Sequence, residues 1–215
     1  MPTSNDINAT HSTASRITRS ATEAAEMLRQ GALLAYPTES VWGIGCDAYC
    51  EAAVMQVLTI KQRPMDKGMI VITDSAERIT ALLAGLSKSQ RSQVVSSWQD
   101  NHRGDLQQAQ TWLLPVPSSL TVSVPKWITG QHPSVAVRVI THPLIRQLCA
   151  QLISESNPFG FIVSTSCNPS GQPPATTINE AYGYFGKQIG YLDAPTLGYT
   201  QPSRIRDALT GQTIR

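Results

Sequence analysis

Two polar segments carry the residue types that bind and neutralise an anion. The first is Lys61-Gln62-Arg63, which brings two cations together where a predicted helix ends. The second runs from Ser164 to Asn168 and supplies three hydroxyls and an amide directly after the apolar residues 160–163. Cations facing hydroxyl and amide groups are what a phosphate-rich ligand needs. Because ligands of open α/β sheets bind at the carboxyl ends of strands, we expect the two segments to face each other at such an edge.

A third polar segment follows the apolar residues 32–36, where Thr38 and Ser40 offer hydroxyls ahead of Gly43 and Gly45. Glycines let a backbone approach a ligand closely, although Gly-rich turns after strands are common and often only structural. The sequence contains neither GxxxxGKS/T nor GxGxxG, so P-loop and ordinary dinucleotide sites lose support.

The charged residues leave alternatives open. Lys61, Arg63 and Lys67 also fit a solvated cluster that caps a helix, because the helix dipole favours cations near its C-terminus. Arg138 interrupts the apolar residues 135–140 of a predicted strand, and an unpaired buried guanidinium costs on the order of several kcal/mol. We therefore expect Arg138 to face a carboxylate, a ligand or a solvent-filled cleft.

The composition is that of a globular protein. Of its 215 residues, 41% are hydrophobic and 15% charged, which fits one domain or one domain with a small appendage. The net charge of +2 falls short of the strongly basic footprint of a dedicated nucleic-acid binder. The four cysteines and four histidines lack the spacing of a zinc site or a disulfide framework, so we expect buried free thiols.

The sequence also predicts where the protein resides. No apolar run approaches the ~20 residues of a membrane span, and residues 1–19 lack the apolar core of a signal peptide. We therefore predict a cytoplasmic protein that does not bind a membrane. Residues 1–18 are predicted to be a flexible polar tail, and residues 19–215 a single domain.

Predicted strands and helices alternate along most of the chain. Ser20 and Glu23 form a predicted capping box at the start of a helix that ends at Gly31. Further strands are predicted at 32–36, 68–73, 111–115, 135–140 and 161–163, and further helices at 51–62, 75–86, 141–152 and 178–185. Residues 98–110 are polar, and we predict an exposed loop there. The alternation indicates an α/β or α+β sheet domain.

Five segments together resemble the YrdC/TsaC family: residues 35–43, 61–64, 134–139, 164–171 and 202–211, in that order. The resemblance extends from about residue 19 to residue 215, and the pairing of KxR with SxN is specific to the family. It implies a twisted, mixed, largely open sheet flanked by helices around a concave, positively charged cavity, in the short single-domain form. The family's enzymes are threonylcarbamoyl-AMP synthases, nucleotidyltransferases that use L-threonine, bicarbonate and ATP and release diphosphate.

The resemblance also implies roles for individual residues. Lys61 and Arg63 match the KxR pair and are implied to be catalytic. The implied ATP-binding residues are Lys61, Arg63, Thr111, Ser166, Asn168, Ser203 and Arg215, and the implied threonine-binding residues are Thr38, Lys67, Arg138 and Ser164.

Arg138 has two explanations at this point. Its planar fork of donors suits the α-carboxylate of threonine, or it pairs with a buried acid such as Asp47 or Glu39.

One segment departs from the family pattern W-P-G-P-x-T. Trp98 is followed by residues 99–110 before Thr111, so the Pro-Gly-Pro turn is missing and Thr111 is the match for the family threonine. Lys67 keeps a cation where the family has His or Lys after KxRP.

The implied chemistry requires charge neutralisation more than acid–base catalysis. A threonine carbamate attacks the α-phosphorus of ATP, and cations, hydroxyl donors and the Mg²⁺ that accompanies ATP stabilise the charge. The predicted site accordingly lacks a Ser-His-Asp array, and no metal ligands are assigned in the protein. The product is the donor for threonylcarbamoyladenosine in ANN-decoding tRNAs.

The implied partners are tRNA or another structured RNA and a downstream transferase complex of the TsaD/TsaB/TsaE type, with the chain a monomer or weak dimer. One alternative is an RNA-binding or ribosome-maturation protein that uses the same cavity, which the modest charge and the lack of an aromatic stacking platform disfavour. Another is carbamoyl transfer, as in the YrdC-like domain of hydrogenase-maturation proteins. The zinc-finger and acylphosphatase segments that accompany that domain are absent from the sequence.

Overall fold

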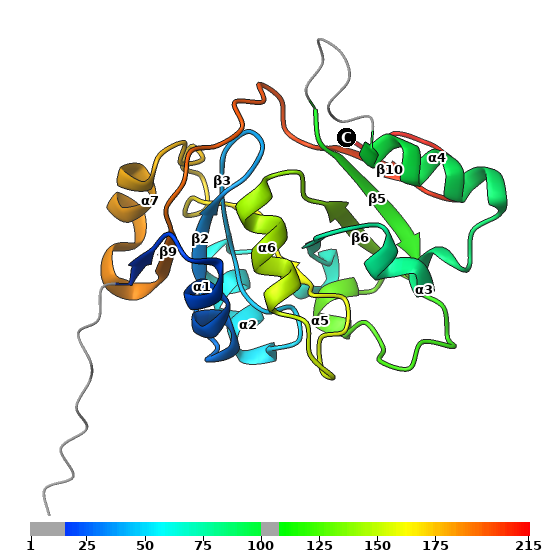
Figure 1. The fold of residues 1–215 in the computed structure, drawn as a ribbon, viewed down its shortest axis with the longest axis horizontal. Helices are drawn as coiled ribbons and strands as arrows, with labels where there is room; N and C mark the ends of the chain where they lie inside the picture. The colour runs from blue at the N-terminus through cyan, green and yellow to red at the C-terminus, as the bar shows by residue number, and fades with distance from the viewer. Residues whose placement is uncertain (1–15, 100–107) are drawn as a thin grey trace, which may run out of the picture.

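The computed structural model describes residues 16–99 and 108–215, whose strands form two five-stranded sheets (Figure 1). One sheet has the order β1-β9-β2-β3-β8, with bounds Ile17–Thr18, Gly190–Leu192, Leu34–Pro37, Trp42–Gly45 and Thr165–Ser166. The other has the order β10-β5-β6-β4-β7, with bounds Arg204–Asp207, Gln110–Pro115, Ser134–Val139, Ile70–Thr73 and Ile162–Val163. Both sheets contain parallel and antiparallel pairs, which confirms the predicted mixed α/β architecture.

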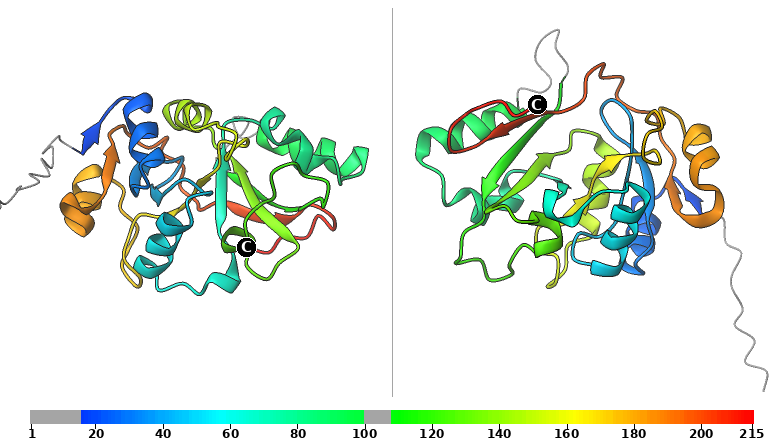
Figure 2. Two further views of the ribbon diagram at one scale, coloured as in Figure 1. Left: turned by 90° about the horizontal axis from the view of Figure 1, so that it is seen from below. Right: turned by 180° about the vertical axis from the view of Figure 1, so that it is seen from behind.

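Helices flank both sheets. The α-helices are α1 (Ala21–Arg29), α2 (Glu51–Ile60), α3 (Thr80–Leu83), α4 (Lys88–Gln99), α5 (Lys126–Thr129), α6 (Pro143–Gln151) and α7 (Ile178–Phe185). Short 3₁₀ helices are η1 (Met65–Lys67), η2 (Glu77–Ile79) and η4 (Gly186–Gln188). Helices α7 and α4 lie at opposite ends of the molecule, and residues 193–203 cross between the two halves to join β9 to β10 (Figures 1 and 2).

The two sheets are joined at Ser164. Strand β7 of one sheet ends at Val163 and strand β8 of the other begins at Thr165, so the chain changes sheet within the polar run. Strand β3 approaches this crossing so closely that a Cβ on Gly45 would lie 1.6 Å from the carbonyl oxygen of Val163. Only glycine permits that approach, which brings the hydroxyl-rich segment against the end of β3.

Apolar side chains fill the space between sheets and helices. Trp42, Trp112 and Tyr36 are among the largest fully buried side chains. Helices α1 and α6 pack against each other through a cluster that contains Leu28 and Leu148. Within the described residues, no helix is long and apolar enough to cross a membrane.

Most predicted elements are confirmed, and α7 has the bounds that the sequence predicted. The capping box is half right. Ser20 accepts the N–H of Glu23 at 3.4 Å, but the Glu23 carboxylate accepts the Thr18 hydroxyl instead of the Ser20 N–H. The Thr18 oxygen takes that N–H, so a neighbouring hydroxyl replaces the direct bond.

Three of the predicted segments differ from the structure. The single helix predicted at 75–86 is divided into η2 and α3, because the backbone leaves the helical conformation at Ile79. Residues 98–99 end α4 and Gln110 begins β5, so the predicted loop is shorter at both ends, and residues 100–107 lie outside the described residues. Of the predicted tail, residues 1–15 also lie outside them, whereas Ile17–Thr18 form β1 and pair with β9.

Candidate functional site

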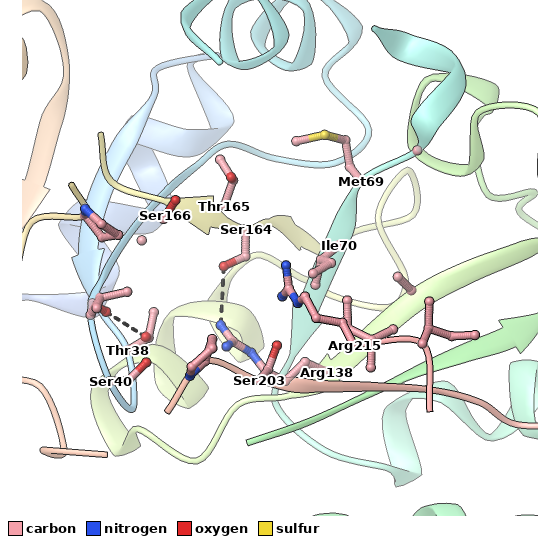
Figure 3. A pocket seen from close by; sticks show the side chains of 18 of the residues that line it. Thr38, Ser40, Met69, Ile70, Arg138, Ser164, Thr165, Ser166, Ser203 and Arg215 are labelled. Atoms are coloured by element: carbon pink, nitrogen blue, oxygen red, sulfur yellow. Dashed lines mark hydrogen bonds between the residues drawn. The ribbon is translucent and has the colours of Figure 1, made fainter. Parts of the chain in front are cut away.

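A cavity of about 860 Å³ lies between the two sheets. Strands β3 and β8 of one sheet and β4, β5, β6 and β10 of the other contribute to its lining. The 193–203 segment adds Tyr199, Thr200, Gln201 and Pro202 on its way to β10. Figure 3 shows hydroxyl-bearing residues such as Thr38, Ser164, Ser166 and Ser203 around this space. The cavity is therefore the place where the separate polar segments of the sequence come together.

Four cationic side chains line the cavity: Arg63, Lys67, Arg138 and Arg215. Among residues 16–99 and 108–215, no Asp or Glu is part of the lining. An excess of guanidinium and ammonium groups over carboxylates in a partly enclosed space favours an anionic ligand. This lining supports the predicted positive character of the cavity.

The KxR and SxN segments contact each other through Lys61. Its Nζ atom donates to the carbonyl oxygens of Ser166 and Asn168 at 3.0 and 2.8 Å, and to Asn168 Oδ1 at 2.9 Å. A longer contact of 3.4 Å joins Nζ to Ser166 Oγ. Burial lowers the pKa of the Lys61 ammonium from its usual value. Lys61 and Asn168 are not among the lining residues, so this contact holds the Ser166 loop from behind the cavity.

The turn at Gln62 sends the two cations of the KxR segment in different directions. Gln62 has φ of 45°, and its N–H donates to Thr59 O at 3.1 Å while the Arg63 N–H donates to Leu58 O at 3.0 Å. These two bonds are a Schellman cap, which requires a left-handed residue directly after the C-cap Lys61. Arg63 consequently reaches the cavity while Lys61 turns toward Asn168.

Arg63 is oriented by the turn that follows it. Its Nε and Nη2 atoms donate to the carbonyl oxygen of Gly68 at 3.0 and 2.7 Å, and Nη2 donates to Lys67 O at 3.2 Å. Burial and then the nearby positive charge of Arg215 lower the pKa of Arg63, and Asp66 partly offsets this. The two guanidinium groups repel each other at the cavity wall. An anion such as a phosphate group would relieve this repulsion by binding between them.

Arg138 lies on β6 and points toward Ser164 (Figure 3). Its Nη2 donates to Ser164 Oγ at 3.4 Å, its Nη1 lies 3.5 Å from Glu39 Oε2, and its Nε has no hydrogen-bond partner among the described residues. The guanidinium therefore pairs with a buried acid, Glu39, as one explanation expected, and it also lines the cavity, where binding of the threonine carboxylate stays a prediction. Asp47 takes no part in the pair, because its carboxylate accepts the Asn157 amide and the Tyr49 N–H.

The remaining predicted residues occupy different positions. Thr38 lines the cavity, but its hydroxyl already donates to Val41 O at 2.6 Å. Thr111 is fully buried outside the lining, and it donates to Ser203 Oγ at 3.1 Å. Arg215 reaches the cavity because the C-terminal residues fold back on β10, where Ile205 N–H donates to Arg215 O at 2.9 Å.

Sequence reasoning missed several lining residues, among them His132, Ser134, Thr165, Thr176 and Gln201. Thr165 is one of the three hydroxyl residues of the 164–168 run, so its place in that run was an available signal. Gln201 directly precedes the family-like segment that begins at Pro202, and this position was a weaker signal. Ser134 begins the family-like segment 134–139, which was a signal, whereas His132 depends on how the turn after α5 folds, which no pattern in the sequence specified.

Fold and site together define an α/β protein built around a cavity for an anionic ligand. A sequence profile named Sua5_yciO_yrdC, described as "Telomere recombination", matches residues 26–215. The chain belongs to this Sua5/YciO/YrdC family, which confirms the resemblance found in the sequence.

Three relatives share the name threonylcarbamoyl-AMP synthase. The Psychrobacter arcticus protein is 60% identical over 207 residues, which are 93% of this chain and 97% of that protein. The Acinetobacter baylyi protein is 50% identical and covers 93% of this chain and 98% of its own length. The Moraxella catarrhalis protein is 46% identical, with coverage of 89% and 92%.

Two solved structures share the fold. P. abyssi Sua5, crystallised with L-threonine, superposes with a TM-score of 0.69 at 28% identity, over 87% of this chain and 50% of that one. This chain therefore spans about half of the Sua5 chain. E. coli YciO superposes with a TM-score of 0.66 at 18% identity, over 90% of this chain and 86% of its own, and supports the fold alone.

Proposed function

We propose that this chain catalyses the formation of threonylcarbamoyl-AMP from L-threonine, bicarbonate and ATP, with release of diphosphate. The observation that carries the proposal is the 60% identity, over 93% of the chain, to a protein named for that activity. The cavity lining supports it, because a triphosphate and an amino-acid carboxylate are both anions that guanidinium and hydroxyl groups bind well.

We assign the KxR side of the cavity to ATP. Arg63, Ser166, Ser203 and Arg215 line the cavity and would contact the nucleotide. Lys61, Asn168 and Thr111 stand behind them, where Lys61 fixes the Ser166 loop and Thr111 donates to Ser203.

We assign the β6 side of the cavity to threonine. Arg138 would bind the α-carboxylate with the donors that Glu39 and Ser164 leave unused. Thr38 and Lys67 line the same cavity and complete the proposed threonine site. The bound L-threonine of the Sua5 relative is consistent with an amino-acid site in this fold.

The proposed reaction has two bond-forming steps. The threonine amine, once deprotonated, attacks the carbon of bicarbonate, which releases water and leaves a carbamate. A carbamate oxygen then attacks the α-phosphorus, and the bond from that phosphorus to the diphosphate oxygen breaks. Negative charge gathers on the leaving diphosphate, where Arg63 and Arg215 are placed to stabilise it.

Magnesium enters this proposal as part of the substrate, MgATP. Within the described part of the chain, no three His, Cys, Asp or Glu side chains come together in a group that could hold a metal ion. Mg²⁺ would therefore be coordinated chiefly by the ATP phosphates, with cavity hydroxyls such as Ser166 available to it or to its waters.

We further propose that the product passes to a transferase complex of the TsaD/TsaB/TsaE type that modifies tRNA. A mixed anhydride of carbamate and phosphate is a reactive acyl donor, so a consuming enzyme has to follow. The four cysteines are free thiols, three of them buried, which fits a reducing compartment such as the cytoplasm.

The test is direct detection of the product. The protein is incubated with MgATP, bicarbonate and isotopically labelled threonine, and threonylcarbamoyl-AMP is sought by mass spectrometry. We expect the labelled adenylate to form without RNA. Absence of the adenylate from active, folded protein, or ATP hydrolysis that is equally fast without threonine, would overturn the proposal.

A further inference from the structure

Glu39 is a buried carboxylate that the reaction described above does not use. It is 1% exposed and belongs to the turn after β2, next to Thr38 of the cavity wall. Its Oε1 atom accepts the N–H of Thr141 at 2.9 Å and the Thr141 hydroxyl at 3.0 Å. A carboxylate removed from water needs such partners, because burying it unpaired is strongly unfavourable.

The other carboxylate oxygen faces Arg138. Glu39 Oε2 accepts no hydrogen bond among the described residues and lies 3.5 Å from Arg138 Nη1. One side chain thus connects the turn after β2 in the first sheet to β6 and the loop after it in the second. The backbone carbonyl of Glu39 also accepts the N–H of Tyr199, on the segment that crosses between the halves.

The weakness of the direct contacts around Arg138 makes this connection informative. Its 3.4 Å contact to Ser164 and its 3.5 Å contact to Glu39 are both long for charge-assisted hydrogen bonds. The guanidinium is balanced in charge by Glu39 without being saturated, and Arg138 is among the residues that line the cavity. An anion can therefore bind Arg138 without first displacing a strong internal bond.

We propose that Glu39 is a positioning residue that holds the Arg138 guanidinium in the cavity in the orientation that binds the threonine carboxylate. Because the role of Arg138 belongs to the proposed function, the role of Glu39 rests on it as well. Glu39 itself does not line the cavity and acts through the arginine. The two bonds from Thr141 fix the carboxylate, and the carboxylate in turn fixes one edge of the guanidinium.

The variant Glu39→Gln separates this role from a purely structural one. The glutamine oxygen can still accept both Thr141 bonds, but its NH₂ group would face the Nη1 donor of Arg138. We expect the Michaelis constant for threonine to rise about tenfold or more, and that for ATP to change less than about twofold. Asp47→Asn is the matched control, because Asp47 also accepts a backbone N–H and a side-chain amide but does not touch Arg138. Asparagine keeps an oxygen that can accept both bonds, so this variant should not separate the two Michaelis constants.

A double-mutant cycle with Arg138→Gln tests whether Glu39 acts through the arginine. In the Arg138→Gln background, adding Glu39→Gln should change threonine binding little further, because the contact it breaks is already gone. Additive effects, or a Michaelis constant for threonine within about twofold of wild type in Glu39→Gln, would overturn the positioning role.

If Glu39→Gln does not fold, Thr141→Val removes only the 3.0 Å hydroxyl bond and should give a smaller rise in the Michaelis constant for threonine. Wild-type protein without threonine-dependent product would instead overturn the proposed function itself.

Discussion

Two cations of the cavity region differ sharply in how the protein holds them. Lys61 Nζ has four oxygen atoms of Ser166 and Asn168 within 2.8–3.4 Å, three of them at 3.0 Å or less. Arg138 has five N–H donors in principle but, among residues 16–99 and 108–215, only a 3.4 Å hydrogen bond and a 3.5 Å ion pair. The Lys61 ammonium is committed to the protein, whereas the Arg138 guanidinium is not saturated by protein partners and can still bind a ligand. One positively charged residue can thus build the site while another stays ready to bind a ligand.

The largest expected effect comes from removing a cation on the KxR side. Arg63→Ala should lower kcat/KM by about 10²–10³, the usual cost of losing one preorganised donor. Lys61→Ala should also lower it, because the Ser166 segment that lines the cavity loses its support. The two variants should differ in stability. Lys61→Ala removes three hydrogen bonds of 3.0 Å or less to Ser166 and Asn168 and should lower the melting temperature, whereas Arg63→Ala should change it less.

The control for both variants is Lys88→Ala, because Lys88 is an exposed residue of α4 away from the cavity. It should leave both activity and melting temperature unchanged. Near-wild-type turnover in Arg63→Ala would mean that Arg63 only belongs to a solvated cluster that caps the helix. Equal stability of the Lys61→Ala and Arg63→Ala proteins would contradict the larger structural role assigned to Lys61.

An intermediate effect is expected from Arg138→Lys. Lysine can keep the ion pair with Glu39 but loses the planar fork, so the Michaelis constant for threonine should rise by about tenfold. The constant for ATP should change much less. Steady-state titrations of each substrate, with a melting curve of the same preparation, check this. A large loss of stability with equal changes in both constants would mean that Arg138 serves only its buried pair.

A smaller effect concerns alkaline stability beside Lys61. Burial raises the pKa of the Cys167 thiol to about 12, and the Lys61 charge partly offsets this. The folded protein then binds the thiol proton more tightly than the unfolded chain. Cys167 therefore contributes stability below the ordinary thiol pKa of about 8.5, and this stability is lost as the pH rises toward 12. Cys167→Ala should therefore show a shallower fall in the free energy of unfolding above about pH 9 than wild type. Cys50→Ala, which alters a less buried thiol, is the control, and an unchanged slope in Cys167→Ala would contradict the prediction.

The smallest effect is expected at Gln62, the left-handed residue between the two cations. Gln62→Gly removes the cost of a side chain at φ of 45° and should raise stability by up to about 1 kcal/mol with activity retained. Gln62→Val should lower both, because a β-branched residue fits this conformation poorly. Chemical denaturation measures the difference. Destabilisation by the glycine would show that the Gln62 side chain, and not the backbone turn, is what the site needs.

Sequence reasoning identified the segments of the site better than the contacts within it. The hydroxyl run at 164–168 and the KxR turn were expected to face each other, and Lys61 joins them. Which acid meets Arg138 was not decidable, because Glu39 and Asp47 are both near apolar strands. The choice depends on how β2 and β6 from different sheets approach each other.

Missed elements have a similar physical explanation. Helix α4 was not predicted because only Val94 and Trp98 are buried along its 12 residues, so its apolar stripe is too sparse to show a period. Helix α7, in contrast, has capping residues at both ends. Thr177 is the N-cap, whose side chain accepts the Glu180 N–H, and Gly186 with φ of 52° is the C-cap. Local capping signals of this kind are readable from sequence, whereas burial by distant strands is not.

The most direct test of the account is the substrate dependence of diphosphate release. Purified protein with MgATP is assayed with threonine and bicarbonate together, with each omitted in turn, and with and without added tRNA. We predict release only when threonine and bicarbonate are both present, at a rate that tRNA does not change. Release that requires tRNA, or that continues at the same rate without threonine, would contradict the assignment of the cavity to threonine and ATP.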